Sequence, residues 1–171
     1  MKLNTLEEVL IEHLRDLYDA EKNLVRALPK MAKASESEEL AEAFRGHLEE
    51  TKQHVVRLEQ VFEQFDQKAR AKACKAMRGL IEEGGEAASE EGSLSDLAII
   101  AAAQKVEHYE ISAYGTAIAW AEKLGNRKAA ALLEETLEEE KAADSKLTGI
   151  TNDILEAASK VGQEQEEMEE V

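Results

Sequence analysis

The sequence predicts an all-α protein built as a bundle of four long helices. Alanine, leucine, glutamate and lysine, all strong helix formers, dominate its 171 residues, and it contains one proline. Aromatic residues make up only 4% of the chain, too few for a β-sandwich or a barrel. Apolar residues recur with the helical period of about 3.6 along the long stretches of the chain. A chain of this length is expected to form one domain with a buried core.

The first two helices are expected to form an antiparallel pair. The first is predicted to begin at Thr5, because Thr5 and Glu8 have the spacing of a capping box. Pro29 has no backbone N–H and is expected to kink or end this helix. The second helix is predicted over residues 38–65, after a turn at residues 34–38.

A second helical pair is predicted after a long connection, which should carry a short helix at residues 73–83. The third and fourth long helices are expected at residues 95–124 and 127–160, separated by a stop at Gly125-Asn126. One long crossover between two hairpins is the connectivity of ferritin-like bundles. The bundle is assigned to residues 1–161, and residues 162–171 are expected to be a disordered acidic tail.

The charge of the chain excludes some partners and favours others. There are 37 acidic residues against 21 basic ones, which gives a net charge of −16. Such a surface repels nucleic acids and anionic membranes, and it attracts cations. The chain has one cysteine, no apolar signal segment and no run of eighteen apolar residues, so we expect a cytoplasmic protein with no membrane partner.

Each predicted long helix carries polar residues where its apolar stripe calls for a buried side chain. In chain order these are Glu21, His47, Glu50, Thr51, His54, Glu107, Glu110, Tyr114, Glu140 and Asp144. They lie near the middle of each helix, so antiparallel packing would bring them to the same depth. Carboxylates gathered in a core of low dielectric repel one another unless protons or cations compensate. The nearby basic residues lie off the stripes and are expected to face outward: Lys22, Lys52, Lys105 and Lys141. Bound metal is therefore the favoured compensation, as in di-iron and di-manganese carboxylate bundles.

The spacing of the candidate ligands leaves two choices open. A single glutamate at the edge of a stripe is usually solvated, but glutamates on four helices together favour a site. Glu50 is followed by His54 four residues later, on the same helix face, and His47 is the rival nitrogen ligand. On the third helix, either Glu107 or Glu110 could supply the carboxylate.

Other reactive residues are expected to have structural roles. His13 and His108 are not favoured as ligands, since His108 faces about 100° away from its neighbour Glu107. Cys74 shares an apolar face with leucine and methionine and is expected to be a buried, inert thiol. Tyr18 and Tyr114 have the positions of ordinary residues at the edge of a core, but a tyrosine beside a metal site could donate a hydrogen bond or an electron, and Tyr114 is the better candidate.

Several segments resemble the bacterial YciE/YciF family of ferritin-like proteins. They are residues 17–22 (LYDAEK), 47–51 (HLEET), 73–77 (ACKAM), 106–111 (VEHYEI), 114–115 (YG) and 137–144 (LEEEKAAD). The similarity covers residues 4–160. It implies a ferritin-like bundle with an added short helix, which is commonly dimeric and expressed under stress, and it implies a ferroxidase or related di-metal activity.

The resemblance also implies roles for individual residues. Glu21 would be the terminal ligand of the first helix, Glu50 would bridge two metals, and His54 would be the nitrogen ligand. Glu140 would be the second bridge, and Asp144 stands where many members of the wider superfamily have histidine. The third helix would contribute one or both of its glutamates, which resemble the doubled glutamate of rubrerythrins.

The buried polar residues and the resemblance together predict a protein that binds two iron ions, or alternatively manganese. The resemblance further implies a homodimer that oxidises Fe(II) with O2 or H2O2. Two other functions are compatible with the same residues. The protein could be a stress-response dimer that protects or scaffolds other proteins without catalysis. It could also sequester metal without turnover.

Overall fold

The structure is a computed structural model that describes residues 3–92 and 94–169, with side chains described as far as Ser159. The described residues form helices and no strands. The helices are α1 (Leu6–Ala34), α2 (Glu38–Glu63), α3 (Lys75–Ala87), α4 (Ser95–Lys123) and α5 (Arg127–Glu169).

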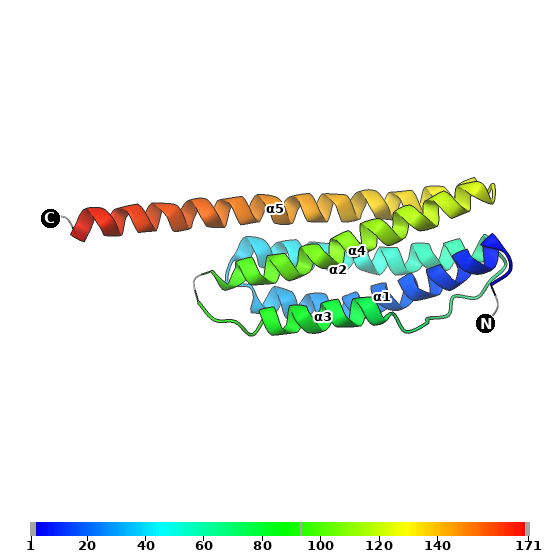
Figure 1. Ribbon diagram of the computed structural model, residues 1–171, viewed down its shortest axis with the longest axis horizontal. Coiled ribbons are helices and arrows are strands. Elements are labelled where there is room, and N and C mark those ends of the chain that lie inside the picture. Colours follow the sequence, from blue (N-terminus) through cyan, green and yellow to red (C-terminus); the bar gives the residue numbers. More distant parts are fainter. Residues whose placement is uncertain (1–2, 93, 170–171) are drawn as a thin grey trace.

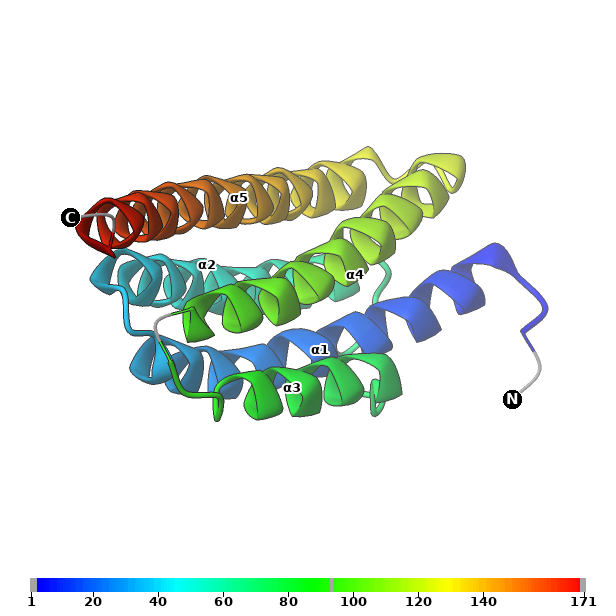
Figure 2. The same cartoon turned by 60° about the vertical axis from the view of Figure 1, so that its left-hand side comes forward.

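The four long helices pack as two antiparallel pairs, and the short helix α3 covers one side of them. α1 pairs with α2, and α4 pairs with α5. α2 also packs against α5, and α1 packs against α4, which closes the bundle (Figure 2). The crossover from α2 to α4 runs the length of the molecule and carries α3, which packs on α1 and α4 (Figure 1). The predicted ferritin-like connectivity is confirmed.

The helix ends agree with the sequence in most places. The Thr5 side chain accepts from the Glu8 N–H at 3.1 Å, and the Glu8 carboxylate accepts from the Thr5 N–H at 3.1 Å, so the capping box is confirmed. Gly125, with a φ of 75°, makes the predicted left-handed turn between α4 and α5.

Three predicted helix ends need correction. α1 does not end at Pro29 but continues to Ala34, because Pro29 is exposed and the buried Leu28 and Ala32 keep the helix packed. α3 does not stop before the Gly84-Gly85 pair, which lies inside it; Gly84 packs against Met31.

The third correction concerns the C-terminal end of the bundle. α5 continues beyond residue 160 to Glu169. The side chains of residues 162–171 lie outside the described part of the structure, so the predicted disorder of this segment stays a prediction. None of the described helices is long and apolar enough to cross a membrane.

The buried core consists of two apolar clusters at different depths along the bundle. One contains Leu14, Leu17, Leu58, Phe62, Ala113, Ala117 and Leu133. The other contains Leu24, Leu28, Phe44, Met77, Ile100, Val106 and Leu147. On α2, α4 and α5 the buried glutamates and histidines fall between the residues of these two clusters, and on α1 Glu21 lies next to Ala20 of the second cluster.

Candidate metal centre

A layer of buried polar side chains separates the two apolar clusters. It is formed by Glu21 of α1, His47, Thr51 and His54 of α2, Glu107 and Glu110 of α4, and Glu140 of α5. None of these residues is more than 7% exposed, and five of them are fully buried. The predicted meeting of polar residues at one depth is therefore confirmed, with all four long helices contributing.

His54 belongs to one group of three side chains that could hold a metal ion, together with Glu21 and Glu140. The His54 Nδ1 atom lies 3.0 Å from Glu140 Oε1 and 3.5 Å from Glu21 Oε1. The group thus draws one ligand from each of α1, α2 and α5. All three residues are 0% exposed.

His47 belongs to a second group, with Glu107, Glu110 and Glu140. The His47 Nε2 atom lies 3.5 Å from both Glu107 Oε1 and Glu140 Oε2. Glu140 is common to both groups, and the ligand atoms within each group lie within 4.8 Å of one another. The two alternatives left open by the sequence are not exclusive, because both histidines and both α4 glutamates lie in the layer.

Among the described residues, many polar atoms of the layer have no hydrogen-bond partner. They are Glu21 Oε2, His47 Nε2, His54 Nδ1, Glu107 Oε2, and both carboxylate oxygens of Glu110 and of Glu140. Unpartnered buried carboxylate oxygens are costly, and proteins retain them where protons or cations satisfy them. Imidazole nitrogens and carboxylate oxygens together suit iron, manganese and zinc, so the residues present fit a divalent metal.

The pKa values of the layer show how the groups interact without metal. Burial raises the pKa of the Glu107, Glu110 and Glu140 carboxyls above the usual range, and neighbouring carboxylates add to this for Glu110. Burial acts against the charged form of His54, but contacts with Glu140 and Glu21 outweigh it and raise its pKa to about 11. The metal-free layer therefore holds protons at neutral pH, and a metal ion would displace them.

Tyr114 lies at the edge of this layer, as predicted. It is fully buried on α4, and its hydroxyl donates a hydrogen bond to Glu21 Oε1. Burial, followed by the Glu21 charge, raises the pKa of the Tyr114 hydroxyl, which keeps it protonated. Its catalytic role stays a prediction.

Arg57 and Glu139 support His54, and they were not predicted from the sequence because neither lies on an apolar stripe. His54 Nε2 lies 2.8 Å from Glu139 Oε2. Arg57 donates to both oxygens of Glu139, at 2.6 and 2.8 Å, and its side chain is only 14% exposed. The paired carboxylate fixes the imidazole orientation, as groups behind metal-binding histidines commonly do.

Glu50 lies outside the buried layer, so its expected burial is wrong. Its side chain is 49% exposed, and its Oε2 atom lies 3.1 Å from His47 Nδ1. Thr51 fills the buried position beside it, with its hydroxyl bonded to the His47 carbonyl at 2.7 Å. The contact with His47 lowers the pKa of Glu50, which keeps it ionised.

Asp144 is the other predicted ligand that the structure does not bring into either group. Its side chain is 21% exposed and accepts from Gln104 Nε2 at 3.0 Å, with His108 Nε2 at 3.3 Å. His108 is 69% exposed, and His13 contacts the Ala113 carbonyl at 2.8 Å, both away from the layer. As predicted, the four off-stripe lysines are exposed: Lys22, Lys52, Lys105 and Lys141.

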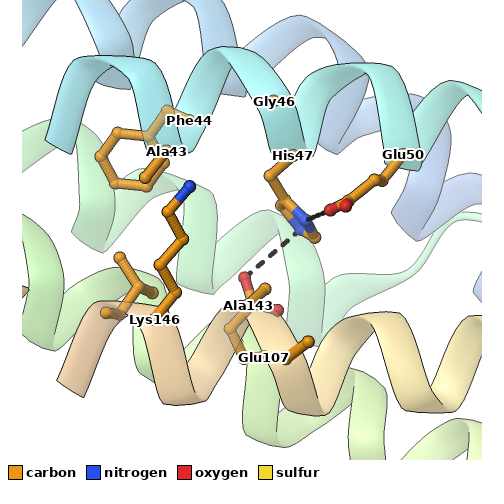
Figure 3. A pocket seen from close by; sticks show the side chains of 10 residues that line it. Ala43, Phe44, Gly46, His47, Glu50, Glu107, Ala143 and Lys146 are labelled. Carbon is orange, nitrogen blue, oxygen red and sulfur yellow. Dashed lines mark hydrogen bonds and ion pairs between the residues drawn. The ribbon is translucent and has the colours of Figure 1, made fainter. Parts of the chain in front are cut away.

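An opening between α2 and α5 leads from the surface to this layer (Figure 3). It is a cavity of about 130 Å³ whose lining includes Glu50, His47 and Glu107. A second cavity of about 40 Å³ reaches His47 and Glu107 from beneath α3, between apolar side chains such as Leu80 and Ile81.

Comparison with known proteins identifies close relatives. Residues 5–160 match a family described as "Domain of unknown function (DUF892)". The chain is 53% identical to Protein YciF of Escherichia coli K12 over 153 residues, which are 88% of this chain and 92% of that protein.

Solved structures agree with this relationship. The crystal structure of the E. coli stress protein YciF matches with a TM-score of 0.87 at 50% identity, covering 90% of this chain and 99% of that one. YcfI from Rhodopseudomonas palustris matches with a TM-score of 0.83 at 44% identity, covering 86% and 95%. A protein of Xanthomonas campestris has the same fold at 20% identity, with a TM-score of 0.72 and coverage of 94% and 99%.

Proposed function

The chain belongs to the YciF family, matched as DUF892, and on this premise we propose that it binds two divalent metal ions in the bundle core and oxidises Fe(II) with O2 or H2O2. The metal would be iron, or alternatively manganese. The E. coli relative is called a stress protein, and we extend a role in stress to this chain.

The main support for this proposal is the set of unpartnered carboxylate oxygens in the buried layer. Glu107, Glu110 and Glu140 expose no more than 3% of their surface, yet five of their oxygens have no hydrogen-bond donor in the part of the chain that the structure describes. A core of packed apolar residues would be more stable than such a layer unless cations or protons bind it. Two histidines that face these oxygens give the layer the donor atoms of a transition-metal site.

The two groups of side chains would each hold one ion. Glu21, His54 and Glu140 would hold the first, and His47, Glu107 and Glu110 would hold the second with a share in Glu140. When bound, a pair of Fe(II) ions supplies two electrons, which with two protons reduce one H2O2 to two waters. The roles of Glu50 and Asp144 as ligands have no support from these distances.

The chain's own residues would position the ions and exclude competing water. Arg57 holds Glu139, and Glu139 holds the outer nitrogen of His54, so the inner nitrogen faces the carboxylates. Tyr114 holds Glu21 from the other side. The apolar clusters above and below the layer keep bulk water from the carboxylates.

Anaerobic titration of chelator-treated protein with Fe(II), followed by addition of O2 or H2O2, tests the proposal. We expect about two ions per chain and oxidation faster than in buffer. Binding of less than one ion per chain, with oxidation no faster than in buffer, would rule the function out. Tight binding without faster oxidation would instead favour metal sequestration.

Three expectations from the sequence stay predictions: a homodimer, a cytoplasmic location and the lack of nucleic-acid and membrane partners. Size-exclusion chromatography with light scattering tests the first. A dimer that binds no metal would favour the scaffolding function.

A further inference from the structure

The opening between α2 and α5 is kept free by small side chains. Ala43 and Gly46 line it from α2, and Ala143 lines it from α5. A Cβ atom added at Gly46 would meet nothing within 4 Å, so the space beside this glycine is open. Figure 3 shows these residues around the path to His47 and Glu107.

Side chains with metal-binding atoms follow one another along this opening with decreasing exposure. Glu50 has a side chain 49% exposed, while His47 is 7% exposed, Glu107 3% and Glu140 0%. The steps between them are short: Glu50 Oε2 to His47 Nδ1 is 3.1 Å, and His47 Nε2 to Glu107 Oε1 or to Glu140 Oε2 is 3.5 Å. An ion could pass from each set of donors to the next without crossing an apolar gap.

The charges at the mouth leave Glu50 available to a cation. Lys146 is the basic side chain in the lining, and Figure 3 shows it directed towards Phe44 and Ala43, with His47 between it and Glu50. The other cavity that reaches His47 is lined mainly by apolar side chains, including Leu80. A hydrated divalent cation is strongly disfavoured on such a lining.

We propose that divalent cations enter the core through the opening between α2 and α5, and that Glu50 is the first carboxylate to bind them. The ion then moves from Glu50 to His47, and Glu50 is not one of its final ligands. This inference rests on the proposed metal-binding function. It assigns Glu50 a role in the rate of loading and not in the final affinity.

Stopped-flow loading of the chelator-treated full chain with Co(II), followed by its visible absorbance, tests the role of Glu50. Glu50→Gln should slow loading about tenfold, because a charged mouth raises the rate of cation capture. The stoichiometry should not change, and the affinity should change less than about threefold. Glu49→Gln is the matched control, since Glu49 is the neighbouring exposed glutamate and binds Lys52 instead.

A second pair of variants tests the opening itself. Gly46→Leu adds a side chain beside the path, and its Cβ atom would meet nothing within 4 Å, so it should slow loading without lowering stoichiometry or unfolding the protein. Gly149→Leu is the control, because Gly149 is an exposed helical glycine of α5 that does not line the opening and has equally free space. Loss of helicity, checked by circular dichroism, would disqualify either variant as a probe.

Three outcomes would contradict the proposal in different ways. Wild-type loading rates in both Glu50→Gln and Gly46→Leu would rule out this entrance while leaving the metal site in place. A drop to one Co(II) per chain in Glu50→Gln would show that Glu50 is a permanent ligand. Absence of Co(II) binding in the wild type would overturn the proposed function together with the entrance.

Discussion

The two histidines of α2 occupy similar places but have different surroundings. His47 and His54 lie two helical turns apart, with ring centroids separated by 6.1 Å. The outer nitrogen of His54 faces Glu139, which Arg57 holds with two hydrogen bonds. The outer nitrogen of His47 faces Glu50, which is 49% exposed and has no arginine in contact within the described residues.

This difference divides the centre into two halves. The His54 half, with Glu21 and Glu140, is enclosed, and the His47 half, with Glu107 and Glu110, is accessible from the opening. His54 is 0% exposed, and its supporting carboxylate is held in a charged pair. His47 lies at the inner end of an opening and has a mobile surface glutamate as its neighbour, because an exposed side chain with one contact keeps rotamer freedom. The sealed side suits stable binding, and the open side suits exchange with solvent.

The largest expected effect comes from the residue that the two halves share. Glu140→Gln keeps the shape of the side chain and removes the charge common to both groups, so both ions should be lost. The free energy of unfolding of the metal-free protein should change by no more than about 2 kcal/mol, because the weakened contact with His54 is offset by reduced repulsion from the neighbouring carboxylates. Metal analysis and thermal unfolding measure the two effects.

The matched control for this variant is Glu138→Gln. Glu138 is exposed on the same helix and pairs with Lys141. It should keep the full metal content. Retention of both ions in Glu140→Gln would show that the two groups do not depend on a shared carboxylate.

The next largest effect should separate the two halves. Arg57→Gln frees Glu139 and with it the orientation of His54, so the affinity of the His54 half should fall about 10- to 100-fold while the His47 half changes little. Stepwise titration with Co(II) distinguishes the two binding events. Arg45→Gln is the control, because Arg45 pairs with exposed Glu38 and Glu42 on the same helix; equal weakening of both halves would contradict the comparison.

The pH dependence of binding should reflect the protons held by the metal-free layer. His54, with a pKa raised to about 11, keeps its proton at neutral pH, and burial raises the pKa of Glu107 and Glu110, which favours their protonated forms. A metal must displace these protons, so affinity should increase as the pH rises, by up to about tenfold per pH unit for each proton released. Calorimetry in two buffers with different ionisation enthalpies counts the protons, and an unchanged enthalpy would contradict the prediction.

The sequence was sufficient for the fold because each helix carries its own signal. The capping box at Thr5, the αL glycine at Gly125 and the apolar period are local, and each was found where predicted. The common depth of the polar residues on the four helices also follows from local patterns, since polar residues interrupt each apolar stripe near its middle. Helix ends were less predictable, because buried neighbours such as Leu28 and Ala32 can hold a helix together beyond a proline.

The details of the site depend on contacts that no single helix encodes. Neighbours such as Glu50 and Thr51 differ by about 100° around the helix axis, so a small rotation decides which of them is buried. The structure buries Thr51 and leaves Glu50 at the opening. The support of His54 by Glu139 and Arg57 joins α5 to α2, and a pattern along one helix cannot reveal it.

The smallest expected effect concerns Asp144, which the sequence placed among the ligands. Asp144 contacts Gln104 and exposed His108, and it belongs to neither buried group. Asp144→Asn should therefore keep both ions and change the affinity of either half by less than about twofold, because an amide can replace the hydrogen bond to Gln104. Loss of one ion would show that Asp144 turns inward when metal binds, and that the open half of the centre uses a carboxylate from one turn further along α5.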